Sequence, residues 1–316
     1  MTMRDDAARR TRPAFLSRNE RFQSVPSTND IVRDWLTEGT PEVCLAVADE
    51  QTAGRGRSGR SWVAPNGAAL LLSLGFRPAY LDPDRLWRLG AIVALAMADA
   101  AEEAAGLSMS RLRLKWPNDI VVEARRAPGG VRKVAGILGE SEGAGTPDVT
   151  ATVGIGINND WRRGDFPADL TDVMTSLREV SRGRRVENDV LLDAFLVRLE
   201  ARLVALRDGH FDVAGWHDRQ VTTGRAVRIE LPGGEIREVT AVGVDGLTGA
   251  LIVADDLGAE SELLAGEVVH VRLAPEEAAP GATVASTDTG EATPEAAAEA
   301  APALPGAESG PEGVTN

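Results

Sequence analysis

Cysteine is nearly absent from this sequence: Cys44 is the only one in 316 residues, so no disulfide can form within the chain. A single free cysteine fits a reducing compartment. Long apolar runs are also absent, because the longest one, residues 89–98, falls short of the roughly 20 residues that cross a bilayer. The N-terminal residues 1–12 are charged and lack the apolar centre of a secretory signal. We therefore expect a soluble, cytoplasmic protein with no membrane partner.

Basic residues are scarce as well, with 34 Lys and Arg against 48 Asp and Glu, and the formal net charge is −14. Residues 274–316 hold eight carboxylates and no Lys, Arg or His, so the rest of the chain is only mildly acidic. Nucleic-acid binding normally requires a basic face toward the phosphates. The charge balance therefore predicts that nucleic acid is not a partner.

The hydrophobic pattern predicts an α+β fold with a mixed, largely antiparallel sheet. A helix is expected to start at Ser27, and apolar residues repeat at helical spacing over residues 84–105 and 190–206. Short apolar or alternating segments predict strands over residues 43–48, 68–76, 111–116, 120–122, 133–140 and 150–157.

The pattern changes after about residue 220. Short strand candidates at residues 227–231, 237–244, 250–253 and 268–273 alternate with Gly-rich turns, which is typical of a small β-barrel. From residue 274 onward Ala, Pro, Glu, Gly and Thr dominate, so that segment cannot bury enough apolar surface to fold. We expect a disordered leader over residues 1–20, a large domain over 21–219, a small barrel over 220–273 and a disordered acidic tail over 274–316.

A Gly/Arg loop, Ala53–Trp62, lies between two apolar strand candidates. Its glycines let the backbone wrap closely around a ligand. Its guanidinium groups, on Arg55, Arg57 and Arg60, suit phosphate or carboxylate, and Trp62 offers an apolar face for the uncharged part of the same ligand. The alternative is a disordered Gly/Arg segment that binds nucleic acid without specificity.

Four further motifs allow both a structural and a functional reading. Residues 27–30, Ser-Thr-Asn-Asp, form a capping box or face a ligand with their polar groups. Lys115–Asp119 is a surface turn or a functional loop that carries a cation, an amide and a carboxylate. Lys133–Glu140 starts a strand with a lysine that is either solvated or functional. Gly154–Asn159 is similar to half of a dinucleotide fingerprint, but no third Gly follows, so a Rossmann site fits poorly.

Together and in this order, the motifs resemble the biotin protein ligase family, over about residues 22–273. The residues that carry the resemblance are Ser27-Thr28-Asn29, Gln51–Arg60, Lys115-Trp-Pro-Asn-Asp119, Lys133–Leu138 and Gly154–Asn158. The resemblance implies the biotin/lipoate ligase catalytic fold over residues 21–219, followed by an SH3-like β-barrel. It also implies a two-step reaction with Mg²⁺, in which biotin and ATP give biotinyl-5′-AMP and a lysine of a biotin carboxyl carrier protein domain, from acetyl-CoA or related carboxylases, then takes the biotin.

That chemistry needs no nucleophile from the enzyme, because the biotin carboxylate is the nucleophile of the first step and the acceptor lysine is that of the second. Catalysis is then positioning and charge neutralisation at phosphorus, which Arg, Lys and Mg²⁺ provide. The resemblance implies that Lys133 bridges the carboxylate and the α-phosphate with Arg57. It implies that Asp119 helps with Mg²⁺, which is held mainly through the phosphates, or with the incoming lysine.

Binding residues are implied in the same way. The biotin site would comprise Ser27, Thr28, Asn29, Gln51, Gly54, Arg55, Gly56, Arg57, Trp62, Lys133 and Gly136. The ATP site would comprise Arg57, Arg60, Asn118, Lys133 and Asn158. Arg272 is the nearest candidate for an arginine that the family uses near the end of its C-terminal barrel.

Some family members carry an N-terminal winged helix that represses transcription. Only about 20 residues precede the matching region here, which predicts a ligase without repressor activity. Two other functions stay open: a lipoate–protein ligase, and a non-catalytic sensor that binds biotin or an adenylate. The Gly/Arg loop and the Lys115–Asp119 motif favour biotin over lipoate, and Lys133 with the loop arginines argues against the sensor.

Overall fold

The computed structural model describes residues 13–265 and 270–273. The predicted acidic tail and the first 12 residues of the predicted leader lie outside the described residues. In the described ranges no helix combines the length and the apolar character needed to cross a membrane.

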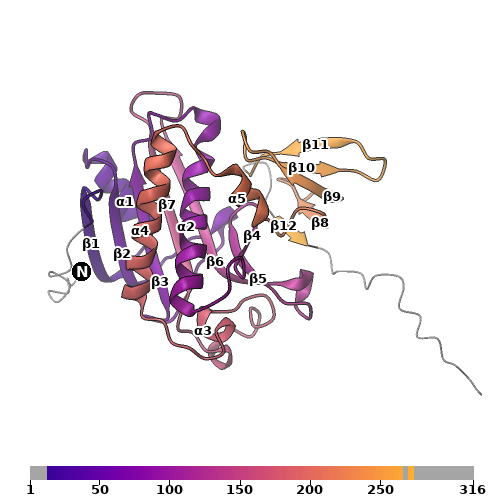
Figure 1. The fold of residues 1–316 in the computed structure, drawn as a ribbon, viewed down its shortest axis with the longest axis horizontal. Coiled ribbons are helices and arrows are strands. Elements are labelled where there is room, and N and C mark those ends of the chain that lie inside the picture. Colours follow the sequence, from indigo (N-terminus) through magenta and orange to yellow (C-terminus); the bar gives the residue numbers. More distant parts are fainter. Residues whose placement is uncertain (1–12, 266–269, 274–316) are drawn as a thin grey trace, which may run out of the picture. The chain divides into compact units, whose positions relative to one another are not determined.

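Seven strands form a mixed sheet in the order β1-β2-β3-β7-β6-β5-β4 (Figure 1). The first strand, β1, runs parallel to β2, and every other neighbouring pair is antiparallel. The predicted α+β fold with a largely antiparallel sheet is confirmed. The strands are β1 (Arg18–Val25), β2 (Cys44–Gln51), β3 (Ala69–Phe76), β4 (Arg113–Lys115), β5 (Asp119–Glu123), β6 (Val131–Glu142) and β7 (Thr150–Asn158).

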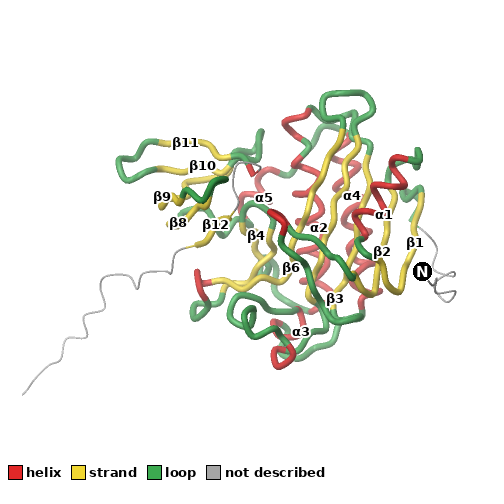
Figure 2. Tube along the Cα trace, turned by 180° about the vertical axis from the view of Figure 1, so that it is seen from behind, coloured by secondary structure: helices red, strands yellow, loops and turns green. Residues whose placement is uncertain are grey.

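Helices cover both faces of this sheet, and the side chains of β2 show which residues face each layer of helices. These side chains alternate between the faces: Cys44 and Ala46 are buried in a cluster with Trp35 of α1 (Thr28–Thr37). Leu45 and Val47 are buried instead in the main core. That core includes α2 (Trp87–Ala105) and α4 (Asn188–Arg207), which lie side by side in Figures 1 and 2. Burial on both faces is why the first five residues of β2, Cys44–Ala48, are all apolar.

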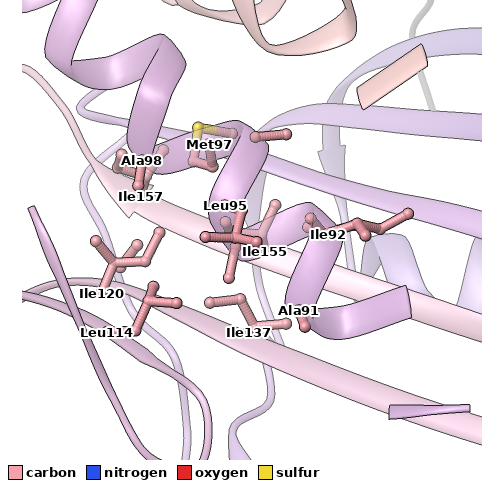
Figure 3. Packing of buried hydrophobic residues seen from close by; sticks show 14 of the residues in the cluster. Ala91, Ile92, Leu95, Met97, Ala98, Leu114, Ile120, Ile137, Ile155 and Ile157 are labelled. Carbon is pink, nitrogen blue, oxygen red and sulfur yellow. The ribbon is translucent and has the colours of Figure 1, made fainter. Parts of the chain in front are cut away.

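The central helix, α2, packs on β6 and β7 (Figure 3). Leu95 and Ala91 belong to the same core as Ile137 of β6 and Ile155 of β7. Complete burial of one such large side chain stabilises the fold by about 1.5–3 kcal/mol. The helix ends at Gly106, whose φ of 63° is a left-handed conformation that glycine adopts without strain.

A second sheet of five antiparallel strands follows, in the order β11-β10-β9-β8-β12. Indole nitrogens of the first domain bond to its turn, since Trp87 Nε1 donates to Leu247 O and Trp116 Nε1 to Gly249 O, both at 3.0 Å. The turn and the first domain are therefore in direct contact. The strands are β8 (Arg225–Glu230), β9 (Ile236–Val244), β10 (Leu251–Ala254), β11 (Glu260–Leu263) and β12 (His270–Leu273); the remaining short helices are α3 (Leu177–Val180) and α5 (Val213–Asp218).

Some sequence predictions are wrong. The leader is not disordered as far as residue 20, because Leu16 is buried in the core and β1 starts at Arg18. The predicted capping box does not form: Ser27 is the N-cap of α1, but its side chain makes no capping hydrogen bond. Strands β1 and β11 were missed because their mostly polar and charged residues hide the alternation on which strand prediction depends.

Candidate functional site

A cavity of about 600 Å³ lies where the Gly/Arg loop meets β6, β7 and β12. Its size falls within the range of small-molecule sites. Every site residue predicted from the sequence lines it except Gly54, and Arg272 lines it too. The predicted residues around the cavity are Ser27, Thr28, Asn29, Gln51, Arg55, Gly56, Arg57, Arg60, Trp62, Asn118, Asp119, Lys133, Gly136 and Asn158.

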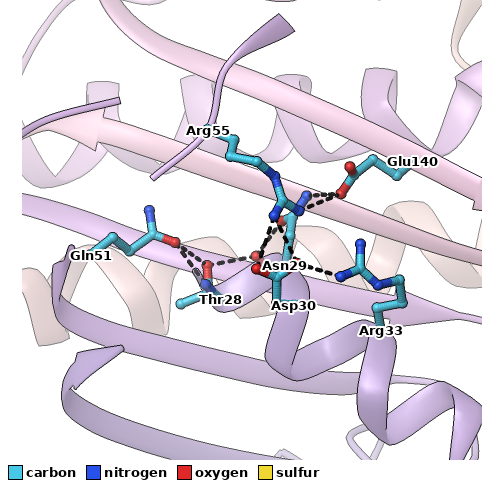
Figure 4. Close-up of polar contacts among 8 residues, drawn as sticks. Thr28, Asn29, Asp30, Arg33, Gln51, Arg55 and Glu140 are labelled. Carbon is cyan, nitrogen blue, oxygen red and sulfur yellow. Dashed lines mark hydrogen bonds and ion pairs between the residues drawn. The ribbon is translucent and has the colours of Figure 1, made fainter. Parts of the chain in front are cut away.

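One end of the cavity is a polar cluster at the start of α1 (Figure 4). The side chain of Gln51 accepts hydrogen bonds from Thr28, at 2.7 Å from the backbone nitrogen and 3.0 Å from the hydroxyl. The buried hydroxyl of Ser73 lies 2.7 Å from Thr28 Oγ1 and 2.6 Å from Asn29 Oδ1. These bonds orient the hydroxyl and amide groups before any ligand arrives, so this end is organised for a small polar head group.

Glu140 and Asp30 complete this cluster. The Asn29 amide donates to Glu140 Oε2 at 2.7 Å. Arg55 donates to both oxygens of Asp30, at 2.8 and 2.9 Å, and reaches Glu140 at 3.4 Å. The hydrogen bond to Asp30 is the main reason why the pKa of Arg55 is raised. Arg55 thus lies over the first turn of α1, held by two carboxylates, while it still lines the cavity.

Glycines form the floor of the cavity. Gly136 of β6 stands opposite Gly156 of β7 in the sheet register. A Cβ on Gly156 would lie 2.6 Å from the Trp62 ring, and one on Gly154 would lie 2.1 Å from Asn29 Oδ1. Contacts this short would force the neighbours to move, so the bare backbone is what lets the indole and the amide lie against the sheet. Gly54 serves the loop itself, because its Cβ would meet the backbone oxygen of Trp62 at 2.5 Å.

For the biotin that the family resemblance implies as ligand, we expect the substitution Gly156→Ala to raise the KM by at least about five-fold. The added methyl group displaces the Trp62 ring, and overpacking of this kind costs roughly 1–3 kcal/mol, of which each 1.4 kcal/mol is a factor of about ten. Steady-state adenylation at varied biotin concentration measures the effect. Gly164→Ala is the control, because a Cβ there has no neighbour within 4 Å. An unchanged KM in Gly156→Ala would contradict the contact.

The other end of the cavity is cationic. Lys133 Nζ lies 2.6 Å from Asp119 Oδ1, and Lys115 Nζ lies 3.8 Å from Asp119 Oδ2. Burial disfavours the charged form of Asp119, but the two ammonium groups outweigh it and lower the pKa of this carboxyl. Burial lowers the pKa of Lys115, and Lys133 adds to that effect while Asp119 opposes it. With both lysines charged, one carboxylate does not balance them, and an anion would complete the arrangement.

Arg57 and Arg60 add two more cations. The guanidinium of Arg57 donates to Ala265 O, which ties the Gly/Arg loop to the segment after β11, and Arg60 Nε donates to Arg57 O at 3.2 Å. Burial lowers the pKa of Arg57, and the charge of Arg60 lowers it further while Asp119 opposes. Two guanidinium groups that repel each other beside two lysines attract a polyanion such as a triphosphate.

Two buried polar atoms of the lining have no hydrogen-bond partner among the described residues: Trp62 Nε1 and Asn158 Oδ1. The Asn158 amide nitrogen donates to Thr175 O at 3.0 Å, which fixes the direction of the oxygen. Leaving a buried donor or acceptor unpaired costs about 1–3 kcal/mol. A bound ligand would therefore be stabilised by accepting from the indole and donating to the amide. In contrast, the amide of Asn118 is used within the protein, since it donates to Ile137 O at 2.7 Å.

The residues do not fit a metal ion held by the protein. Residues 13–265 and 270–273 contain no group of three or more His, Cys, Asp or Glu side chains that could hold one. Asp119 is the one carboxylate in the described lining, and it lies between two ammonium groups. A magnesium ion in this cavity would need most of its oxygen ligands from a bound ligand.

Sequence reasoning missed several lining or supporting residues. Ser73 and Glu140 orient the polar end, yet neither was assigned to the site. Ser73 is the single polar residue of an apolar strand, and Glu140 ends the Lys133–Glu140 motif, in which only the lysine was considered. Lys115 was part of a motif but was not assigned to the site, yet it lines the cavity and lies 3.8 Å from Asp119. Leu170 and Val173, from the segment before α3, line the cavity and follow no recognisable pattern.

Comparisons with known proteins agree with this geometry. Residues 21–158 match the family described as "Biotin/lipoate A/B protein ligase family". The chain is 32% identical over 229 residues to the biotin--[acetyl-CoA-carboxylase] ligase of Mycobacterium tuberculosis, which covers 72% of this chain and 79% of that protein. It is 33% identical over 178 residues to the bifunctional ligase/repressor BirA of Bacillus subtilis, covering 56% of this chain and 51% of that protein.

The chain therefore spans about half the length of the Bacillus relative. Among solved structures it is similar to the biotin protein ligase from Aquifex aeolicus in complex with biotin and ATP, with a TM-score of 0.66 and 26% identity. That similarity covers 82% of this chain and 100% of the Aquifex chain. With a relative that is more than 30% identical and matched over most of its length, the chain belongs to the biotin protein ligase family.

Proposed function

We propose that this chain attaches biotin to a lysine of a biotin carboxyl carrier protein domain, in an ATP-dependent reaction that passes through biotinyl-5′-AMP. One observation carries the proposal: a single cavity joins a prearranged polar end, at Thr28 and Gln51, to a cationic end, at Lys133 and Arg57. Such a cavity suits a molecule with a polar head, an apolar middle and a carboxylate that must meet a triphosphate. The solved Aquifex relative contains biotin and ATP, which supports the same two substrates here.

In the first step the biotin carboxylate attacks the α-phosphorus of ATP, and pyrophosphate leaves with the electrons of the broken P–O bond. The residues described here stabilise charge rather than form a covalent bond. Lys133 and Arg57 lie where negative charge gathers on the carboxylate and the phosphate, and preorganised cations in a partly buried site lower the barrier to such a step. No enzyme nucleophile is needed in this step, because both reacting groups belong to the substrates.

Residue roles follow from this placement. The polar end, Ser27, Thr28, Asn29 and Gln51, would hold the ureido group of biotin, and the Trp62 ring would cover its apolar part. Arg60 and Asn158 would contact the nucleotide, the latter through its unpartnered oxygen. Arg55 would turn from Asp30 to the adenylate once that anion is present, which exchanges one set of oxygen partners for another. Magnesium would arrive with ATP as substrate.

The second step joins the acceptor lysine to the biotinyl group, and Asp119 would act there rather than on a metal. Its carboxylate, 2.6 Å from Lys133, is placed to accept a proton or to orient an amine. We also propose the predicted division of labour, with residues 21–219 as the catalytic domain and 220–273 as a small domain that closes the cavity through β12. The net charge of −14 supports a ligase with no nucleic-acid partner and no repressor activity.

Biotin-dependent exchange of labelled pyrophosphate into ATP tests the proposed function. We expect exchange with biotin, and none with lipoate or without an acid. Labelled pyrophosphate enters ATP only when the adenylate forms and then reverts to ATP, and forming the adenylate requires a bound carboxylate that attacks the α-phosphorus. Exchange with lipoate alone would keep the mechanism and change the substrate. If neither acid supports exchange although biotin binds to the folded protein, the chain is a sensor and the proposal is wrong.

A further inference from the structure

A second cavity, of about 260 Å³, lies on the other face of β6 from the floor of the first. It is bounded by Gly139, by the first half of α2 and by Gly249 and Ala265 of the C-terminal region. Gly139 is exposed, so this cavity opens to solvent beside the strand. Five residues line both cavities and mark the junction between them: Arg57, Lys115, Asn118, Asp119 and Ile137.

The second cavity has the chemistry of a site for one flexible side chain. Its volume lies below the roughly 300 Å³ at which sites for drug-sized ligands begin. Most of its other lining is aliphatic or aromatic: Leu86, Trp87, Leu89, Ala91, Ala94, Leu114, Trp116, Ala151, Val153 and Trp216. An aliphatic stem that carries a polar tip would bury its methylene groups against such walls.

This apolar lining contains a buried hydrogen-bond acceptor, on the side chain of Gln220. Gln220 lines the cavity and is only 5% exposed, and its Oε1 has no hydrogen-bond partner in the part of the chain that the structure describes. The backbone holds it in place, because Leu114 N donates to Arg219 O and Val221 N to Leu114 O, both at 2.8 Å. A buried acceptor without a donor costs about 1–3 kcal/mol, which an N–H group of a ligand would recover.

We propose that this second cavity is the passage through which the acceptor lysine of the partner protein reaches the adenylate. The inference rests on the proposed function and adds the route of the second substrate. The lysine stem lies along α2 and the Trp87 and Trp116 rings, and Gln220 accepts from its nitrogen on the way. The nitrogen then enters the first cavity beside Asp119, which lines both cavities.

The charges at the junction of the two cavities favour the neutral amine, which is the reactive form of that lysine. Two cations, Arg57 and Lys115, line the passage with Asp119. Glu140 lines it too, but its carboxylate accepts hydrogen bonds from Asn29 and Arg55. Burial and neighbouring cations disfavour an ammonium group, as they do for Lys115 itself, whose pKa is lowered. The neutral amine uses its lone pair to form the C–N bond to the biotinyl carbonyl carbon. The C–O bond to phosphate then breaks, its electron pair leaves with AMP, and the proton of the nitrogen passes to water.

The substitution Gly139→Leu tests the passage by filling it. A Cβ on Gly139 meets no atom within 4 Å, so the new side chain enters open space without disturbing the sheet. We expect transfer from preformed biotinyl-5′-AMP to a biotin carboxyl carrier protein domain to fall at least ten-fold. Biotin-dependent pyrophosphate exchange should stay within two-fold of the unsubstituted protein, because Gly139 does not line the first cavity. Gly164→Leu is the matched control, since Gly164 is also exposed and a Cβ there meets no atom within 4 Å, but it lines neither cavity.

The outcomes separate the two proposals. If the unsubstituted protein shows no exchange with biotin, the proposed function is wrong. If exchange is normal and Gly139→Leu transfers biotin at the rate of Gly164→Leu, the passage is wrong while the function stands. A fall in exchange as large as the fall in transfer would also overturn the passage, because the cavity would then serve adenylation.

A second variant, Gln220→Met, tests the buried acceptor with little change of volume. We expect the KM for the carrier domain to rise several-fold while exchange is unchanged, because only the acceptor lysine would use the amide oxygen. An unchanged KM together with an unaffected Gly139→Leu would leave the cavity without a role in transfer.

Discussion

Replacing Lys133 by Met should lower biotin-dependent pyrophosphate exchange by about 10²–10³-fold, the loss typical when one preorganised donor to a developing negative charge is removed. Lys133 Nζ lies 5.4 Å from the centre of the Trp62 ring and 2.6 Å from Asp119, so its charge stands between the apolar and the cationic parts of the cavity. Methionine keeps an unbranched stem of similar length and removes the charge alone. The exchange rate at saturating biotin and ATP measures the loss in the chemical step.

Two variants make this result specific to the ammonium group. Arg132→Met changes the preceding residue of β6, whose guanidinium donates to Asp172 O and which lines neither cavity, so exchange should be unchanged. Lys133→Arg keeps the charge but spreads it over a planar fork, and we expect partial activity. Full exchange in Lys133→Met would remove this residue from the adenylation step and shift the charge neutralisation to the arginines.

The sequence was most informative where chemistry and backbone conformation coincide. The Gly/Arg loop was predicted as an anion site because few other roles explain three arginines beside three glycines, and the loop does line the cavity. The helix that starts after Ser27 and the β6 strand that starts near Lys133 were also predicted within a few residues, since apolar periodicity marks both.

The parts of the site that could not be predicted from the sequence depend on contacts between residues far apart in the chain. Glu140 lies 111 residues from Asn29, and only the packing of β6 beside β7 and α1 brings them within 2.7 Å. The glycines of the floor were visible as Gly154 and Gly156, but their effect depends on the Trp62 ring, which arrives from another loop. The capping reading of Ser27 failed for a similar reason: Asp30, its expected partner, is held by Arg55 and Arg33.

Replacing Arg57 by Ala should reduce kcat/KM for ATP by about 10²-fold, because the residue supplies one of the preorganised charges at phosphorus. Without ligand, the variant should be as stable toward unfolding as the unsubstituted protein, despite this loss of activity. The guanidinium is partly buried beside that of Arg60, which lowers its pKa, so removing it relieves repulsion in the absence of an anion. The melting temperature is therefore expected to be unchanged without ATP. The rise that a fixed ATP concentration causes should become smaller, since a ligand at free concentration L stabilises by RT ln(1 + L/Kd) and a weaker affinity raises the Kd.

The substitution Arg57→Lys tests whether the positive charge alone is sufficient or whether the aligned hydrogen bonds of the guanidinium are needed. Arginine donates through a rigid fork that matches phosphate oxygens and here also reaches Ala265 O, while lysine offers a point charge on a flexible stem. We expect the lysine variant to recover ATP-induced stabilisation more than kcat, because attraction survives and alignment does not. Arg111→Ala, exposed and outside both cavities, is the control for loss of a positive charge. If Arg57→Lys matches the unsubstituted protein in kcat, the guanidinium acts by charge alone, and the alignment that the Gly/Arg loop imposes on the phosphate is not needed for catalysis.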